Sequence, residues 1–225
     1  MNAPSILALE GALGTFSASV WSTGSEVADG IRGTNALERG LSLIEEVLQR
    51  AGKALDDMDL FAVGTGPGSF TGLRIAVSYA KSLALALARP LLGVSSYDIV
   101  SDATQRRPAL AVVHGRAGIG CARLRTLEAE FVRCGSYEAI TDMVLEHITP
   151  ATLAVYGDVE GVPAHLAERG FTVLRFPAPQ PPALAVGRLA AQCLARDPAF
   201  RASPHELRPD YGELPAAEVR RAARP

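Results

Sequence analysis

The sequence contains few of the residues from which catalytic and metal centres are usually built. Its 225 residues include three cysteines and four histidines. No C-x-x-C pair occurs, and no two histidines have the i, i+4 spacing that places zinc ligands on one helical face. We therefore expect Cys121, Cys134 and Cys193 to be ordinary buried thiols of a reducing compartment.

Motifs of nucleophilic and phosphate chemistry are also missing. No G-x-S-x-G elbow occurs, and the serines lack a recognisable pattern of histidine and aspartate partners. The glycine-rich run at residues 64–72 has no lysine after its last glycine, and Lys81 lies well inside the following predicted helix. The run is therefore not a Walker loop. A strand, a glycine-rich loop and a helix N-terminus could still bind phosphate through free backbone amides.

Charge and hydropathy exclude two further classes of protein. The net charge of −2 gives no overall basic field of the kind that attracts nucleic acid. The most apolar stretch, residues 73–94, contains Arg74, Lys81 and Arg89 and is too charged to span a bilayer. The first twenty residues have no basic segment, and Glu10 interrupts their apolar run. We expect a cytoplasmic protein without a membrane partner.

The most informative stretch begins at Leu60. Residues 60–63 form a short apolar run that predicts a buried strand, and glycines then predict a tight loop. Ser69 or Thr71 is a suitable N-cap for a helix rich in alanine and leucine, which must end before Pro90. The motif loop, as we call it, comprises Gly66, Pro67, Gly68, Ser69, Phe70, Thr71 and Arg74.

Small side chains recur along one ridge of this predicted helix. They are Gly72, Ala76, Ala80, Ala84 and Ala88. Such a ridge lets another backbone approach closely, because ridges of residues four apart are the surfaces through which helices pack. The neighbouring backbone is either the chain's own sheet or a partner protein. Few polar residues remain on the rest of the helix, which favours the partner.

The remaining pattern predicts an α/β chain with two similar halves. The predicted strands are residues 5–9, 16–21, 26–31, 60–63, 91–94, 109–113, 121–126, 131–134, 152–156 and 171–176. The predicted helices are residues 35–51, the helix after the motif loop, a brief one before residue 103, and residues 137–147, 163–168 and 183–195, with a possible turn of helix at 216–222. Each half gives the order βββαβα, with residues 1–105 as an N-terminal lobe and residues 106–225 as a C-terminal lobe that ends in a loose tail.

The sequence resembles a known family at two places. The run GPGSFTGLRI at residues 66–75 and the opening ILAL at residues 6–9 resemble the TsaB (YeaZ) family, most clearly before Val94. The resemblance implies the two-lobed actin-like (RNase H-like) fold, a duplicated βββαβα arrangement. It also implies a non-catalytic partner of the threonylcarbamoyl transferase that forms N6-threonylcarbamoyladenosine (t6A) in tRNA, since the metal-binding histidine pair of that transferase has no counterpart here.

The same resemblance implies a set of partners. The N-terminal lobe would pair with the catalytic, TsaD-like transferase, and a TsaE-like ATPase is a further expected partner. The chain alone would form a homodimer, and tRNA contact would be indirect. No intrinsic cofactor is expected, with ATP bound only in the complex with the transferase. The expected partner interface comprises Gly72, Ile75, Ala76, Tyr79, Ala80, Leu83, Leu37 and Leu41.

Several positions depart from the family pattern. Glu10 is followed by Gly11, where the family has Asp followed by Thr, and we expect Glu10 to lie in a surface turn. Asn35, in capping-box spacing with Glu38, replaces the first residue of a His-Ser or His-Thr pair. His114 replaces an aspartate, and we expect it to be a structural turn residue. The family's Pro-x-Tyr is retained at residues 209–211.

An alternative function is an actin-like enzyme that binds ATP between its lobes and transfers phosphoryl or carbamoyl groups. Residues 64–72 would then cradle phosphates, and Glu10 would hold Mg²⁺. Arg123 and Arg125 share one face of a predicted strand and could contact phosphate, although we expect a solvated sheet face there. A peptidase, a label often given to relatives of this family, has the least support, because neither a metal site nor a nucleophile motif is present.

Overall fold

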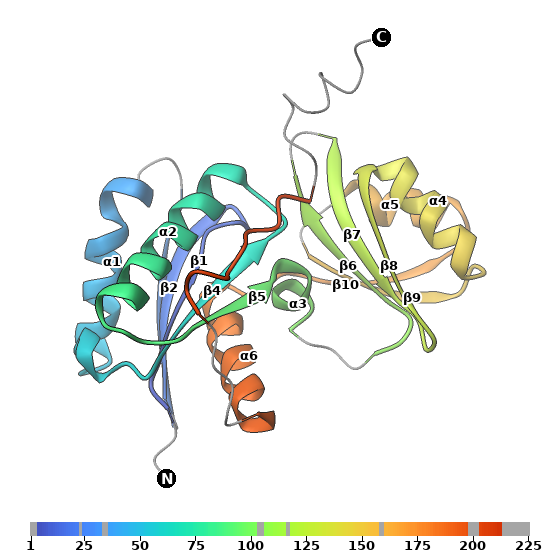
Figure 1. Cartoon of the computed structure of the whole chain (residues 1–225). Helices are drawn as coiled ribbons and strands as arrows, with labels where there is room; N and C mark the ends of the chain where they lie inside the picture. The colour runs from blue at the N-terminus through green and yellow to red at the C-terminus, as the bar shows by residue number, and fades with distance from the viewer. Residues whose placement is uncertain are drawn as a thin grey trace.

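The structure is a computed structural model, and it describes residues 4–22, 24–32, 36–102, 106–115, 118–157, 160–197 and 203–212. Two five-stranded sheets lie beside one another, each covered by helices (Figure 1). The strands are β1 (Ile6–Glu10), β2 (Thr15–Ser22), β3 (Ser25–Arg32), β4 (Leu60–Gly66), β5 (Leu91–Ser95), β6 (Ala109–His114), β7 (Ile119–Arg125), β8 (Glu130–Ser136), β9 (Thr152–Tyr156) and β10 (Thr172–Phe176). The α-helices are α1 (Ala36–Arg50), α2 (Phe70–Ala86), α3 (Ser96–Ser101), α4 (Tyr137–His147), α5 (Gly161–Glu168) and α6 (Ala183–Arg196), and Leu55–Asp57 form a 3₁₀ turn.

The two sheets have the same topology. The first has the order β3-β2-β1-β4-β5, and the second has the order β10-β9-β6-β7-β8. In each, the first three strands form an antiparallel meander, and the fourth strand pairs in parallel with the first. The expected duplicated βββαβα layout is therefore confirmed, including both third strands. This repeated arrangement is the two-lobed actin-like fold.

Each helix buries an apolar face on a sheet. In α1, Leu43, Ile44, Val47 and Leu48 are buried, and α2 lies beside it on the same face of the first sheet (Figure 1). Ser69 caps α2 by accepting a hydrogen bond from the Gly72 amide at 3.3 Å. In the second lobe, α4 and α5 cover the outer face of the second sheet, whereas α3 packs on the face toward the first lobe.

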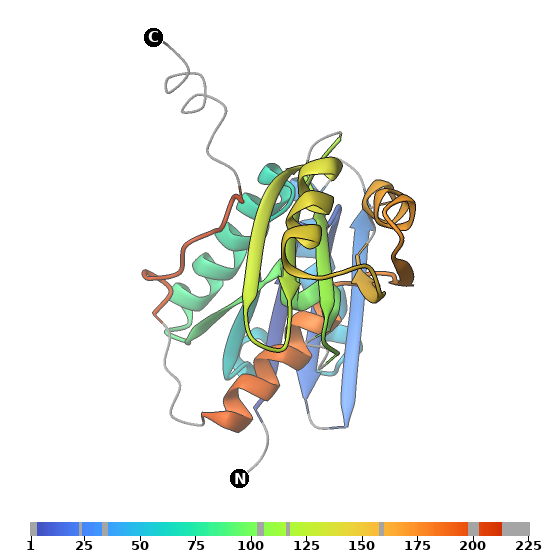
Figure 2. The same ribbon diagram turned by 90° about the vertical axis from the view of Figure 1, so that its right-hand side faces the viewer.

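The two lobes are not two consecutive halves of the chain. Helix α6, which the sequence analysis placed in the C-terminal lobe, packs on the face of the first sheet opposite α2 (Figure 2). Ala185 and Val186 lie in one buried cluster with Ile6 and Ala8 of β1. The Ser19 hydroxyl donates to the Ala183 carbonyl at 2.8 Å. The reason is physical: the first sheet has two apolar faces, and α1 with α2 covers only one of them.

Residues 203–212, which we call the C-terminal strap, also return to the first lobe. They were expected to belong to a loose tail, but they run beside α2 in both views (Figures 1 and 2). Leu207 and Tyr211 pack against the core of the first lobe. The helical turn expected at 216–222 lies outside the described residues. No helix in the described ranges is both long and apolar enough to cross a membrane.

The cysteines differ from the expectation. Cys121 on β7 and Cys134 on β8 lie directly opposite one another in the antiparallel register and form a disulfide, whereas Cys193 on α6 is free. The expectation of three ordinary thiols was therefore wrong for two of them. The two cysteines are 13 positions apart in sequence, and the register of the β7–β8 hairpin brings their sulfur atoms together.

Candidate functional site

The motif loop lies between two other backbone segments. Both segments come so close to the loop that several of its positions have room only for glycine. On one side is the turn after β1. The Ser69 amide donates to the Ala12 carbonyl at 2.7 Å. A Cβ on Gly68 would lie 2.4 Å from the Ala12 carbonyl oxygen, and a Cβ on Gly72 would lie 1.9 Å from that of Gly11. These positions therefore require glycine because the helix start and the turn are in backbone contact.

On its other side the motif loop contacts the C-terminal strap. The Asp210 amide donates to the Thr65 carbonyl at 2.7 Å, and a Cβ on Gly66 would lie 2.1 Å from the Asp210 carbonyl oxygen. The rings of Phe70 and Tyr211 lie 5.0 Å apart, with the Arg74 guanidinium 5.1 Å from the centre of the Phe70 ring. Residues 66–75, which carry the resemblance, are therefore in direct contact with residues 209–211, where the family's Pro-x-Tyr is retained.

Glu10 is not in a surface turn, as we expected, but is fully buried at the end of β1. Its carboxylate accepts hydrogen bonds from the Ala12 amide at 2.7 Å and the Leu13 amide at 3.2 Å. Burial raises the pKa of Glu10 to about 7, and these backbone donors act in the opposite direction. The carboxylate thus satisfies the amides of its own turn and does not line the cleft, which is the position that the alternative Mg²⁺ role would need.

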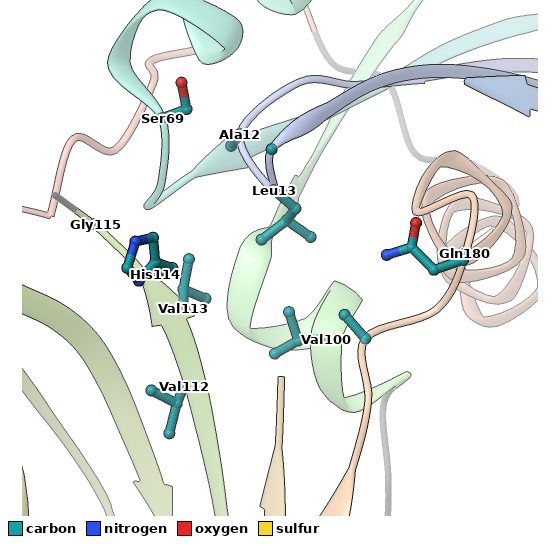
Figure 3. Close-up of a pocket in the computed structure, with 11 residues that line it drawn as sticks. Ala12, Leu13, Ser69, Val100, Val112, Val113, His114, Gly115 and Gln180 are labelled. Carbon is teal, nitrogen blue, oxygen red and sulfur yellow. The ribbon is translucent and has the colours of Figure 1, made fainter. Parts of the chain in front are cut away.

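A cavity of about 300 Å³ lies between the lobes, where β1, β4 and β6 end (Figure 3). Leu13, Val100, Val112 and Val113 line it with apolar surface, and His114 and Gln180 lie on opposite sides. Further lining comes from Ala12, Gly14, Ser69, Gly115 and Ala178. Crevices at the carboxyl ends of parallel strands are the usual ligand sites of α/β sheets. The described lining residues include no carboxylate, and His114 is exposed at the end of β6, as expected of a turn residue.

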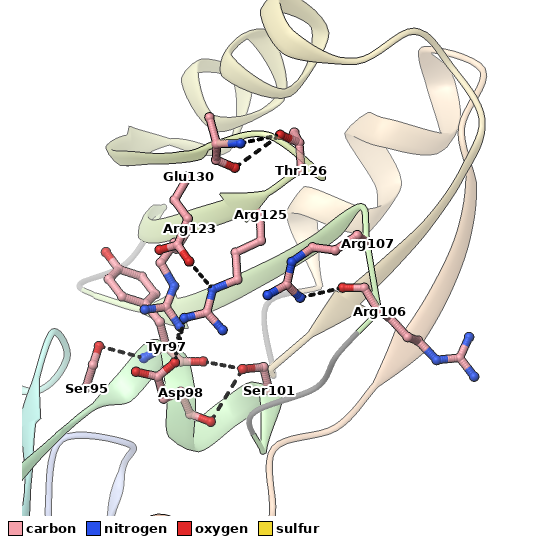
Figure 4. Close-up of polar contacts among 11 residues, drawn as sticks. Ser95, Tyr97, Asp98, Ser101, Arg106, Arg107, Arg123, Arg125, Thr126 and Glu130 are labelled. Carbon is pink, nitrogen blue, oxygen red and sulfur yellow. Dashed lines mark hydrogen bonds and ion pairs between the residues drawn. The ribbon is translucent and has the colours of Figure 1, made fainter. Parts of the chain in front are cut away.

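An ion-pair cluster connects α3 with β7 (Figure 4). Asp98 of α3 accepts hydrogen bonds from Arg123, which is buried, and from Arg125 at 2.9 Å. Arg125 also pairs with Glu130 at 2.7 Å, and Arg123 lies over the Tyr97 ring at 5.2 Å. Burial and the negative charge of Asp210 raise the pKa of Tyr97, whereas Arg123 lowers it. The face of Arg123 and Arg125 is thus an inter-lobe joint, not the solvated face that we expected.

The expected partner interface lies on α1 and α2, and the structure shows that only some of its residues face outward. Ala76 and Ala80 are fully buried against the first sheet, so the ridge of small residues packs on the chain's own strands. Gly72 is partly exposed, but it faces the turn at Gly11. Leu41 is 52% exposed, whereas Ile75, Tyr79 and Leu83 are half-buried. We call these four residues, one on α1 and three on α2, the partner face.

The remaining positions that the sequence singled out are either outside the partner face or outside the described part of the structure. Thr71 and Arg74 are exposed on the first turns of α2. Leu37 falls in α1, but its side chain is outside the described part of the structure, as is the whole of Asn35. Phe70 of the motif loop and Leu85, one of the apolar residues that leave this helix little polar face, are exposed, at 51% and 48%. Within the described ranges, no group of three His, Cys, Asp or Glu side chains is arranged to hold a metal ion.

The fold and the cleft define a two-lobed actin-like protein whose motif loop is packed between the turn after β1 and the C-terminal strap. The family model described as TsaD, tRNA N6-adenosine threonylcarbamoyltransferase, matches residues 33–162. Because this match covers more than half of the chain, the protein belongs to the TsaD family.

Two curated relatives illustrate the range of the match. The tRNA threonylcarbamoyladenosine biosynthesis protein TsaB of Escherichia coli (strain K12) is 32% identical over 118 residues, 50% of this chain and 51% of that protein. The tRNA N6-adenosine threonylcarbamoyltransferase of Gluconobacter oxydans (strain 621H) is 45% identical over 69 residues, 31% of this chain and 19% of that enzyme. The aligned part thus spans about half or less of each relative.

Solved structures extend the likeness in fold to nearly the whole chain. YeaZ from Pseudomonas aeruginosa superposes with a TM-score of 0.71 at 23% identity, over 92% of this chain and 99% of that one. A second structure, described as an uncharacterized protein with similarity to peptidase YeaZ from Pseudomonas aeruginosa, gives a TM-score of 0.73 at 24% identity, over 93% and 100%. These likenesses concern the fold alone.

Proposed function

We propose that this chain is a non-catalytic subunit of the machinery that forms t6A in tRNA, and that it binds the catalytic TsaD-like transferase. The observation that carries the proposal is the partner face, where Leu41 of α1 is 52% exposed and Ile75, Tyr79 and Leu83 of the neighbouring α2 are half-buried. Apolar side chains gathered on two neighbouring helices are typical of a protein interface. The names of the relatives supply the pathway.

The non-catalytic role is supported by the state of Glu10. In the alternative, an ATP-dependent transferase, this residue would hold Mg²⁺ at the end of β1. Its carboxylate is instead fully buried and accepts hydrogen bonds from Ala12 and Leu13. Rebuilding a metal site there would leave the buried Ala12 amide and the partly buried Leu13 amide without this acceptor, and a buried group left unpaired costs roughly 1–3 kcal/mol. We therefore favour the partner role.

Binding to the transferase tests the proposal directly. Leu41→Arg places a cation on the partner face, and we expect it to weaken the affinity at least about tenfold in calorimetric titration. Leu127→Arg is the matched control, because Leu127 is 88% exposed on the second lobe and outside the partner face. Wild-type affinity for both variants would remove the partner face from the proposal. Equal loss in both would point to a non-specific effect of charge.

We further propose that ATP binds only when the transferase is present, that tRNA contacts the transferase and not this chain, and that a TsaE-like ATPase joins the assembly. A fluorescent ATP analogue titrated into the chain alone, the transferase alone and the complex separates these cases. We expect saturable binding only in the complex. Tight Mg²⁺-dependent binding to the isolated chain would favour the ATP-dependent enzyme instead.

A further inference from the structure

We infer that Cys121 and Cys134 form a reversible thiol–disulfide site whose redox state controls the docking of the C-terminal strap on the motif loop. The reactant is a dithiol reductant, either a small molecule or a protein. The inference does not depend on the proposed function, because it concerns contacts within the chain.

The two cysteines of the disulfide differ in exposure. Strand β8 is an edge strand of the second sheet, and Cys134 on it is partly exposed, whereas Cys121 on the inner strand β7 is 5% exposed. We therefore take the Cys134 sulfur as the one that a thiolate attacks. The free Cys193 is on α6 in the other lobe and is not part of the pair.

The reaction is an ordinary thiol–disulfide exchange. The attacking thiolate forms a bond to the Cys134 sulfur, the S–S bond breaks, and the electron pair leaves on the Cys121 sulfur, which takes a proton. The second thiol of the reductant then resolves the mixed disulfide and releases Cys134. The protein gains two electrons and two protons, and the dithiol is oxidised to its own disulfide.

Gly212, at the end of the described strap, lies directly on this pair. Its φ is +70°, and a Cβ there would lie 2.7 Å from the Cys121 sulfur and 3.2 Å from the Cys134 sulfur. The same Cβ would lie 2.8 Å from Cβ of Pro67 in the motif loop. The strap end thus fits between the disulfide of one lobe and the motif loop of the other, and it fits only as glycine.

The end of the strap is held next to the two sulfur atoms, so a change at these atoms has consequences for it. The Asp210 amide donates to Thr65, the Gly212 amide donates to the Asp210 carboxylate at 2.8 Å, and Tyr211 packs on Phe70. When the disulfide is reduced, the two sulfur atoms separate from bonding distance to van der Waals contact. The surface on which Gly212 lies then changes shape, and Gly212 loses its fit between the sulfur atoms and Pro67.

Hydrogen exchange of the full chain, oxidised or reduced by dithiothreitol at one pH, tests the inference. Alkylation under denaturing conditions should modify one thiol in the oxidised protein and all three after reduction. We expect the amides of residues 207–212 to exchange at least about tenfold faster in the reduced protein, while β1 and β4 are unchanged. Three modified thiols under oxidising conditions, or equal exchange of the strap in both states, would overturn the inference.

Three variants sharpen the comparison. The double variant Cys121→Ser, Cys134→Ser should show fast strap exchange and no response to reductant. Gly212→Ala should keep the disulfide but show fast strap exchange in both states, because its Cβ meets both sulfur atoms. Cys193→Ser is the matched control and should behave as wild type. If the double variant does not fold, the two redox states of the wild-type chain provide the same test.

Discussion

Gly72 lies where α2 meets the turn after β1. Because of this contact, we expect replacement of a helical glycine by alanine to destabilise the protein, which is the opposite of the usual effect. Alanine normally stabilises a helix relative to glycine by about 1 kcal/mol. Here a Cβ would lie 1.9 Å from the Gly11 carbonyl oxygen, which cannot move without shifting β1 or α2. We therefore expect Gly72→Ala to lower the free energy of unfolding by about 3 kcal/mol in urea denaturation.

The control for this prediction is Gly135→Ala. Gly135 on β8 has ordinary space, because a Cβ at this position would meet only the Ala139 Cβ, at 3.4 Å. Its replacement should change stability by less than about 0.5 kcal/mol. A stabilised Gly72→Ala variant would mean that the motif loop does not touch the turn.

The raised pKa of Glu10 predicts how the stability of the folded chain depends on pH. Its pKa is raised from 4.5 to about 7 in the folded chain, so between these values the folded state binds more protons than the unfolded state. Stability from this group is therefore fully present below about pH 4.5 and is lost as the pH rises through 7, by roughly 3 kcal/mol in total. Urea denaturation at pH 5 to 8 measures this slope.

Glu10→Gln should remove most of that slope, because its side-chain amide does not titrate in this pH range. Glu45→Gln, which changes an exposed carboxylate of α1, should keep the wild-type slope. Parallel pH profiles for wild type and Glu10→Gln would contradict the assignment of a buried, proton-binding carboxyl group.

At the scale of elements, the joint between α3 and β7 depends on one carboxylate. Asp98 pairs with both Arg123 and Arg125, and Arg123 is buried. Asp98→Asn would leave these two cations without their shared anion, and we expect a loss of about 3 kcal/mol in thermal or urea unfolding. Asp142→Asn removes an exposed pair with Arg169 at 3.8 Å and should cost less than about 0.5 kcal/mol. Equal, small effects would show that the joint is not held electrostatically.

The bounds of the helices and strands could largely be predicted from the sequence. The segments against which each of them packs could not. Helix α4 begins at Tyr137 and ends at His147, as predicted, because Ser136 caps it and an apolar stripe fills it. The ridge of Ala76 and Ala80 was recognised, but its neighbour was not, since a small residue suits a partner and a sheet equally well. Glu10 was misplaced because nothing local shows that a turn will be covered by α2. The Cys121–Cys134 pair depends on strand register in the same way.

At the scale of the whole molecule, the sequence order gives the two sheets but not the assignment of every element to a lobe. Helix α6 and the strap return to the first lobe because its sheet has a second apolar face and its motif loop has an open side. The sequence near α6 and the strap does not show which lobe they pack on. It shows only an amphipathic helix and the motif at residues 209–211. The retained likeness at that motif is explained by its contact with Phe70 and Thr65.

The isolated molecule is expected to pair with itself. An apolar face that normally meets a partner tends to self-associate when the partner is absent. Sedimentation velocity across a range of concentrations should show a monomer–dimer equilibrium for wild type and a monomer for Leu41→Arg, with Leu127→Arg as the control. A monomer at all concentrations would separate homodimer formation from the partner face.

Formation of t6A in a reconstituted reaction tests the central claim most directly. An unmodified substrate tRNA is incubated with the transferase, the activated threonylcarbamoyl donor and either no addition, wild-type chain, Leu41→Arg or Leu127→Arg, and the modified nucleoside is measured by mass spectrometry. We predict full modification with wild type and Leu127→Arg, little with Leu41→Arg, and none when this chain replaces the transferase. Modification by this chain alone, or equal modification with and without it, would contradict the account.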